Sequence, residues 1–168
     1  MSNQNRLNQN MYGNVSAEWE KESNLHKNAL IDCGPQPFIT NIQNDTRSNR
    51  CFRTTLWTCT YLQLTLMSIP AGEDIGLEAH HDVDQFLRIE QGQGIVMMGD
   101  SCDTVAVCGR VYPGCAIFVP AGTWHNLINA GCSPLKLYSI YAPPEHPAGT
   151  VHPTKKDALA DEHHNGKY

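Results

Sequence analysis

The sequence predicts an all-β fold in one domain. Short apolar runs recur between residues 50 and 142, and turns rich in Gly, Pro, Asn and Asp separate many of them at short intervals. No apolar pattern of helical period interrupts this region over a useful length. A chain of 168 residues buries a sizeable core without disulfides, so a single domain accounts for it.

Three parts follow one another along the chain. Residues 1–28 form a polar arm rich in Asn, Gln and Ser, with too little apolar surface to offset the entropy of ordering. Within this arm Ser16 could cap a short helix over residues 17–23, and Trp19 could dock on the barrel or on a partner subunit. Residues 29–158 form the barrel domain, and residues 159–168 form a C-terminal tail.

Within the barrel domain the sequence predicts a polar loop at 44–50, a series of strands, and a proline-rich surface crossing after Tyr141. The crossing leads to a short helix at 153–162, which Thr154 could cap. The strand-like runs lie at 51–59, 61–70, 85–91, 95–100, 104–109, 115–120, 125–130 and 135–143.

Composition excludes several classes of protein. The formal net charge of -5 and the lack of any basic run argue against nucleic acid as a partner. No run of eighteen apolar residues and no apolar signal-peptide core are present, so we expect no membrane segment and a cytoplasmic location. The seven cysteines are odd in number and form no Cys-x-x-Cys pair, which favours reduced, mostly buried residues over disulfides or a zinc ribbon.

Potential metal ligands gather in residues 72–94. On a strand, side chains alternate between the two faces, so Glu78 and His80 share one face and His81 takes the other, unless a bulge exchanges His81 with His80. After a turn at 81–84 the chain resumes as a strand that begins at Gln85, within reach of the same pocket. Further along, a turn at 120–122 leads into His125, which is a natural fourth ligand. Arg88 and Glu90 are expected to form an outward-facing ion pair, although either would line the cavity if the strand register differs.

These two stretches resemble the paired motifs of the cupin superfamily. Gly114, Pro120, Gly122, His125 and Asn129 match the second motif. In the first motif Gly72, His80 and Gly92 match, whereas Glu78 replaces a histidine and Gln85 replaces a glutamate. The span from about 37 to 158 is similar to small single-domain bacterial cupins grouped as mannose-6-phosphate-isomerase-like. The resemblance implies a double-stranded β-helix, or jelly-roll barrel, with an irregular N-terminal arm and a C-terminal extension.

The resemblance implies one divalent metal ion held by Glu78, His80, Gln85 and His125. Exchange of an imidazole for an amide oxygen makes the site richer in oxygen, which favours manganese or iron and leaves nickel, cobalt and zinc possible. Three functions stay open. The favoured one is a sugar isomerase or epimerase, in which Glu78 could be the catalytic base. The alternatives are an iron oxygenase acting on a small organic substrate and a non-catalytic binder or sensor of a small ligand. Gln63, Trp124 and Tyr138 are candidate substrate-binding residues, and a homodimer is expected.

Overall fold

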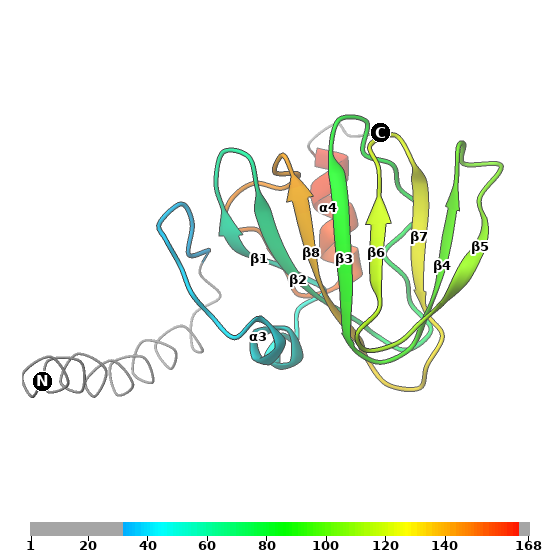
Figure 1. Cartoon of the computed structure of the whole chain (residues 1–168), viewed down its shortest axis with the longest axis horizontal. Coiled ribbons are helices and arrows are strands. Elements are labelled where there is room, and N and C mark those ends of the chain that lie inside the picture. Colours follow the sequence, from blue (N-terminus) through cyan, green and yellow to red (C-terminus); the bar gives the residue numbers. More distant parts are fainter. Residues whose placement is uncertain (1–31, 165–168) are drawn as a thin grey trace, which may run out of the picture. The chain divides into compact units, whose positions relative to one another are not determined.

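The computed structural model describes residues 32–164, which form two antiparallel sheets sharing one core (Figure 1). The predicted all-β class is therefore confirmed. The predicted helix after Ser16, with Trp19, lies outside the described residues. The strands are β1 (Arg53–Thr58), β2 (Gln63–Ile69), β3 (Asp84–Gln91), β4 (Gly94–Gly99), β5 (Ala106–Val111), β6 (Ala116–Val119), β7 (Trp124–Asn129), β8 (Leu135–Ala142) and β9 (Val151–His152).

The larger sheet has the strand order β6-β3-β8-β2-β1-β9, and the smaller sheet has the order β5-β4-β7. In β7 and β8, side chains that enter the core alternate regularly with side chains that face outward. The core draws on both sheets, with Leu87 and Leu137 from the larger one and Val96 and Leu127 from the smaller one. The proline-rich crossing lies between β8 and β9 and contains no helix or strand.

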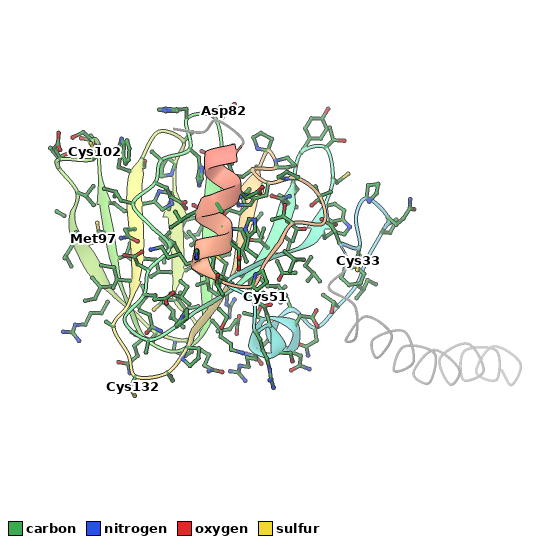
Figure 2. The ribbon with its side chains drawn as sticks, turned by 180° about the vertical axis from the view of Figure 1, so that it is seen from behind. Cys33, Cys51, Asp82, Met97, Cys102 and Cys132 are labelled. Carbon is green, nitrogen blue, oxygen red and sulfur yellow. The ribbon has the colours of Figure 1, made fainter. Side chains whose placement is uncertain are left out.

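The interior of the larger sheet changes from apolar to polar along the strands. One row of paired, buried residues consists of Ile89, Leu137 and Met67. The next row towards the turn at 81–84 consists of Leu87, Ser139 and Thr65, and the last consists of Gln85, Tyr141 and Gln63. Figure 2 places Asp82, in that turn, and Cys132 at opposite ends of the barrel. Because buried polar groups need partners, the polar end near Asp82 is where a binding site is expected.

A helix replaces most of the polar loop predicted at 44–50. Helix α3 (Ile42–Ser48) begins where the side chain of Asn41 accepts a hydrogen bond from the backbone N–H of Asn44, and Asp45 and Arg47 complement the helix dipole. The helix also covers Glu90, which accepts a hydrogen bond from Gln43 Nε2. Helical periodicity is hard to see in a segment this short, so the polar residues of α3 are typical of a loop when only the sequence is considered.

The C-terminal helix was predicted correctly. Helix α4 (Lys155–His164) follows Thr154, which exchanges hydrogen bonds with Asp157, and it continues past residue 158, the predicted end of the domain. Lys155 forms an ion pair with Asp74, and Ala158 belongs to the core. Among the described residues no helix is long and apolar enough to cross a membrane.

The outer face of the larger sheet carries exposed aromatic side chains. Phe118 is 71% exposed and packs edge-on against Phe86, with ring centroids 5.1 Å apart. Tyr138 lies beside Phe86 on the same face, at 6.2 Å between centroids. Arg88 Nε lies 3.2 Å from Glu90 Oε1, as predicted for an outward ion pair, although α3 buries the carboxylate.

The cysteine prediction was right about disulfides and wrong about burial. All seven cysteines are free, but none is buried, and Cys102, Cys108 and Cys132 are exposed. Most of them lie in loops or at strand ends, where apolar neighbours in the sequence do not imply apolar neighbours in space. Cys108 is on β5, one of the two edge strands of the smaller sheet, where several side chains face solvent.

Candidate metal centre

Glu78 and His125 face each other across two short segments. Glu78 N donates to His125 O at 3.1 Å, and His125 N donates to Glu78 O at 2.9 Å, forming an isolated antiparallel bridge. Two residues on, His80 O accepts from Gly122 N at 2.7 Å. The segment around Glu78 therefore runs beside the start of β7 without forming a continuous strand. Alternation still places Glu78 and His80 on one face, while His81 is exposed.

The three side chains converge at the polar end of the barrel. One ligand atom from each of Glu78, His80 and His125 lies within 4.8 Å of the other two. Glu78 Oε1 lies 3.5 Å from His80 Nε2 and 3.5 Å from His125 Nε2. Donor atoms bound to one ion at about 2.1 Å lie about 3.0 to 3.4 Å apart in octahedral or tetrahedral geometry. The two 3.5 Å distances from Glu78 Oε1 are close to the spacing of ligands to a single ion.

Both imidazoles are oriented by their other nitrogen. His125 Nδ1 lies 3.0 Å from Thr123 O, and a carbonyl oxygen only accepts, so Nδ1 is the donor. His80 Nδ1 lies 3.3 Å from Glu145 Oε1, which is again an acceptor when ionised. Both Nε2 atoms are buried and lack a hydrogen-bond partner among the described residues. Two nitrogens turned inward in this way face the Glu78 carboxylate, an arrangement that a bound cation or a proton stabilises.

Charge in the cluster is balanced by protons when no metal is bound. Burial acts to raise the pKa of Glu78, but contact with His125 and His80, and the charge of Arg53, hold it well below its usual value. Burial acts to lower the pKa of His80, but Glu145 and Glu78 outweigh burial and raise it to about 9. A metal ion must therefore displace a proton from His80 at neutral pH.

Gln85, the fourth predicted ligand, starts β3 and is 4% exposed. Its Nε2 donates to Ser139 Oγ at 2.9 Å, and its Oε1 is buried without a hydrogen-bond partner among the described residues. Gln85 pairs with Tyr141, whose ring packs edge-on against His80 at 5.7 Å between centroids. The amide oxygen of Gln85 is buried without a partner among the described residues, and Gln85 is paired with Tyr141, whose ring contacts His80. Both observations are consistent with a role of Gln85 as a ligand.

The structure does not bring the three predicted substrate-binding residues to the cluster. Tyr138 lies on the outer face of the larger sheet, and alternation along β7 turns Trp124 away from the side that His125 faces. Gln63 points inward but is fully buried, and its amide bonds to the backbone of residues 145 and 146. The aromatic ring that does reach the cluster is Tyr141. Burial raises the pKa of its phenol, which therefore stays protonated and donates hydrogen bonds.

The residue that the sequence reading missed is Glu145, in the proline-rich crossing. Its side chain is 14% exposed and contacts His80. His146, the next residue, packs edge-on against Tyr141 at 5.2 Å between centroids. No motif or periodicity marks Glu145, which lies in a crossing that was expected to run over the surface.

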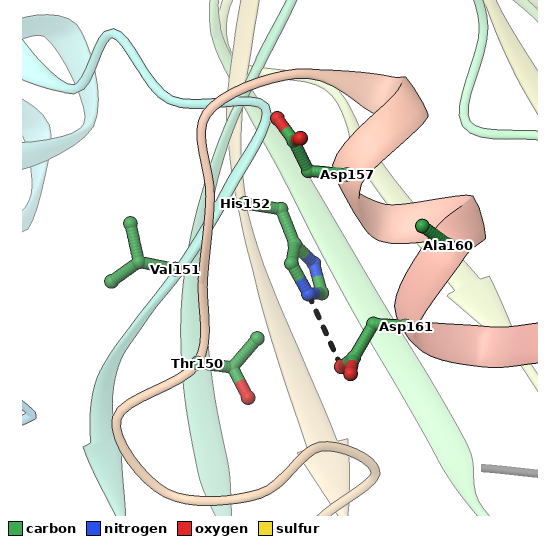
Figure 3. A pocket seen from close by; sticks show the side chains of 6 residues that line it. All are labelled: Thr150, Val151, His152, Asp157, Ala160 and Asp161. Atoms are coloured by element: carbon green, nitrogen blue, oxygen red, sulfur yellow. Dashed lines mark hydrogen bonds and ion pairs between the residues drawn. The ribbon is translucent and has the colours of Figure 1, made fainter. Parts of the chain in front are cut away.

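Two surface cavities lie apart from the cluster. One, of about 480 Å³, lies between β9 and α4 and is shown in Figure 3. In it His152 Nε2 lies 3.3 Å from Asp161 Oδ2. The other, of about 440 Å³, has Phe52, Arg50, Lys136 and Lys155 in its walls. No residue of the Glu78, His80 and His125 cluster lines either cavity, so neither adds a ligand to it.

The residues present fit a divalent metal ion. Two neutral imidazoles and one carboxylate are a common ligand set for first-row transition metals, and an adjacent amide oxygen adds a hard donor. Among the described residues, His80 Nε2, His125 Nε2 and Gln85 Oε1 are buried without a hydrogen-bond partner, and a metal ion bound by them would satisfy all three.

Comparisons with known proteins agree with this picture. Residues 65–141, which include all four predicted ligands, match the family model of the cupin domain. The uncharacterized protein YrkC of Bacillus subtilis is 63% identical over 133 residues, 79% of this chain and 72% of the relative. The uncharacterized protein L612 of Acanthamoeba polyphaga mimivirus is 41% identical over 123 residues, 73% of this chain and 75% of the relative.

A solved structure shows the same barrel. BH2720 from Bacillus halodurans superimposes with a TM-score of 0.76 at 58% sequence identity, covering 77% of this chain and 98% of that protein. The TT1209 protein from Thermus thermophilus, at 23% identity, has a TM-score of 0.52 and shares the fold. With its antiparallel double-stranded β-helix and its matched cupin domain, the chain belongs to the cupin superfamily.

Proposed function

We propose that the chain is a metal-dependent cupin that acts on a small molecule at one divalent ion held by Glu78, His80 and His125, with Gln85 as a weaker fourth ligand. The observation that carries the proposal is the pair of buried Nε2 atoms, each 3.5 Å from Glu78 Oε1 and each turned inward by a partner on Nδ1. Manganese or iron is favoured, because two of the four donors are oxygens.

Two histidines and one carboxylate favour oxidation of a small organic substrate as the reaction. This set of ligands is typical of mononuclear ferrous oxygenases, because it leaves coordination positions open. When bound, the ion would supply Lewis acidity and, as ferrous iron, the electrons for oxygen chemistry. The protein itself supplies a single ligand charge on Glu78, two oriented imidazoles, and the protonated phenol of Tyr141 as a hydrogen-bond donor beside His80.

A sugar isomerase or epimerase is the alternative, and the resemblance to the mannose-6-phosphate-isomerase-like grouping favours it. Such a reaction needs a base near the ion. Glu78, which the sequence suggested for that role, lies between both imidazoles and is better suited to be a ligand. Tyr141 would donate a hydrogen bond to the sugar, but its raised pKa makes it a poor base. The ligand set therefore supports this reaction less well than oxidation.

Elemental analysis of protein purified without added metal is the first test. We expect about one equivalent of manganese or iron in the wild type and none in His125→Ala. The iron-loaded protein is then screened in an oxygen electrode against small organic acids, and the manganese-loaded protein is screened without oxygen against free aldoses and ketoses.

The outcomes separate the three functions. Substrate-dependent oxygen uptake that His125→Ala abolishes would support the oxygenase. Interconversion of sugars without oxygen would support the isomerase, and tight binding without turnover would support a sensor or binder. Wild-type protein that holds no divalent metal, as purified or after loading, would overturn the proposal.

A further inference from the structure

We infer that Glu145 is a positioning residue for the metal centre: its carboxylate orients His80 so that Nε2 faces the ion, and Gln63 holds Glu145 in place. This inference rests on the metal site of the proposed function. It concerns two residues outside the cupin motifs: Glu145, in a crossing of the chain that has no regular secondary structure, and Gln63, at the start of β2.

His80 is the ligand whose orientation depends on a side chain from a distant segment. His125 is held through Nδ1 by the backbone carbonyl of Thr123, which belongs to its own turn. His80 Nδ1 instead meets Glu145 Oε1 at 3.3 Å. The ring is otherwise bordered by the edge-on ring of Tyr141 and the tilted ring of His125, each at 5.7 Å between centroids, and neither ring contact selects which nitrogen faces inward.

A carboxylate on the outer nitrogen of a metal-binding histidine has two effects. It fixes the proton on Nδ1, which leaves the Nε2 lone pair for the ion, and it makes that nitrogen a stronger donor. Glu145 is in position for both effects, because its side chain is only 14% exposed and water screens the contact little.

Gln63 explains why an irregular segment can hold Glu145 so firmly. Gln63 Oε1 accepts from the backbone N–H groups of Glu145 at 3.3 Å and His146 at 3.0 Å. Gln63 Nε2 donates to His146 O at 2.7 Å and to Thr58 Oγ1 at 3.0 Å. The amide therefore makes four hydrogen bonds while it is fully buried, which is its full capacity. Residues 145 and 146 lie outside the strands, and this side chain supplies their backbone with hydrogen bonds.

The test measures Co²⁺ binding by isothermal titration calorimetry and the visible spectrum of the Co²⁺-loaded protein, which reports coordination geometry. The variants are Glu145→Gln, which keeps the shape and removes the charge, Glu145→Ala, and Gln63→Met, which leaves Glu145 intact but removes its anchor. Asp84→Asn is the matched control. Its carboxylate accepts a hydrogen bond from Ala121 N at the same end of the barrel, not from an imidazole.

We expect Glu145→Gln and Glu145→Ala to bind Co²⁺ about 10- to 100-fold more weakly than the wild type, the usual loss when such a partner is removed. Glu145→Ala should also change the spectrum, and Asp84→Asn should match the wild type in both measurements. Gln63→Met should weaken binding in the same direction, with a folded circular dichroism spectrum. A purely structural role for Glu145 predicts a lower melting temperature with unchanged affinity and spectrum, and that result would overturn the inference while leaving the metal site standing. Wild-type protein that binds no Co²⁺ would overturn both.

Discussion

Glu78→Gln tests the metal centre most directly, because it removes the only ligand charge while keeping the shape of the side chain. Loss of a mere hydrogen-bond partner of a ligand weakens metal binding about 10- to 100-fold. Glu78 is itself in the cluster, 3.5 Å from both Nε2 atoms, so its charge should contribute at least about 100-fold.

The effect can be read as a thermal shift. At a Mn²⁺ concentration about 100 times the wild-type Kd, binding stabilises the fold by about 2.7 kcal/mol. For a chain of 168 residues this corresponds to a rise of about 5 to 11 °C in the melting temperature. A variant whose Kd is about 100-fold higher would gain about 0.4 kcal/mol at the same concentration, or about 1 to 2 °C.

Differential scanning fluorimetry with and without Mn²⁺ measures both shifts. Glu73→Gln is the control, because it makes the same chemical change at an exposed carboxylate on the same segment and should keep the full wild-type shift. A Glu78→Gln protein that retains the wild-type shift would refute the role of Glu78 as a ligand. If the wild type shows no shift with any divalent ion, the centre itself is wrongly assigned.

Four further predictions concern the site and the surface. His125→Ala should abolish Mn²⁺ binding, whereas Gln85→Ala should only weaken it, because a neutral amide adds only a modest dipole to the site. Calorimetry on both variants measures the two losses of affinity, and equal losses would contradict this ranking. The pKa of His80 in the metal-free protein is raised to about 9, so protons compete with the metal below that pH. The apparent affinity for Mn²⁺ should therefore rise about tenfold per pH unit up to about pH 9 and then level off. An affinity for Mn²⁺ that is flat between about pH 6 and 8 would count against the bound proton. Phe118→Ser should shift the expected dimer towards monomer in light scattering, because Phe118 is the most exposed aromatic residue of the outer patch that it forms with Phe86; an unchanged mass would move the interface elsewhere. A thiol reagent should modify the exposed cysteines 102, 108 and 132 rapidly in the native protein, and titration after denaturation without reductant should count seven; a lower count would indicate disulfides.

The sequence by itself determined the all-β class and the three converging residues of the candidate metal centre. Both follow from local rules. Alternation along an extended chain aligns Glu78 with His80, and the turn at 120–122 delivers His125 at the start of the next strand. The same rule turns Trp124 away from the pocket, because Trp124 adjoins His125 on β7 and must face the opposite side.

Only the tertiary structure decided how the ligands are oriented. Glu145 meets His80 across 65 residues of sequence, and Gln63 binds the backbone at His146 across 83. No periodicity marks an irregular crossing, so nothing local could show that its carboxylate reaches the barrel interior. The burial of Glu90 under α3 has the same origin, because strand alternation predicts a face and cannot predict what covers that face. Positions on one strand are related by the geometry of the backbone, whereas contacts between distant segments depend on how the whole chain packs.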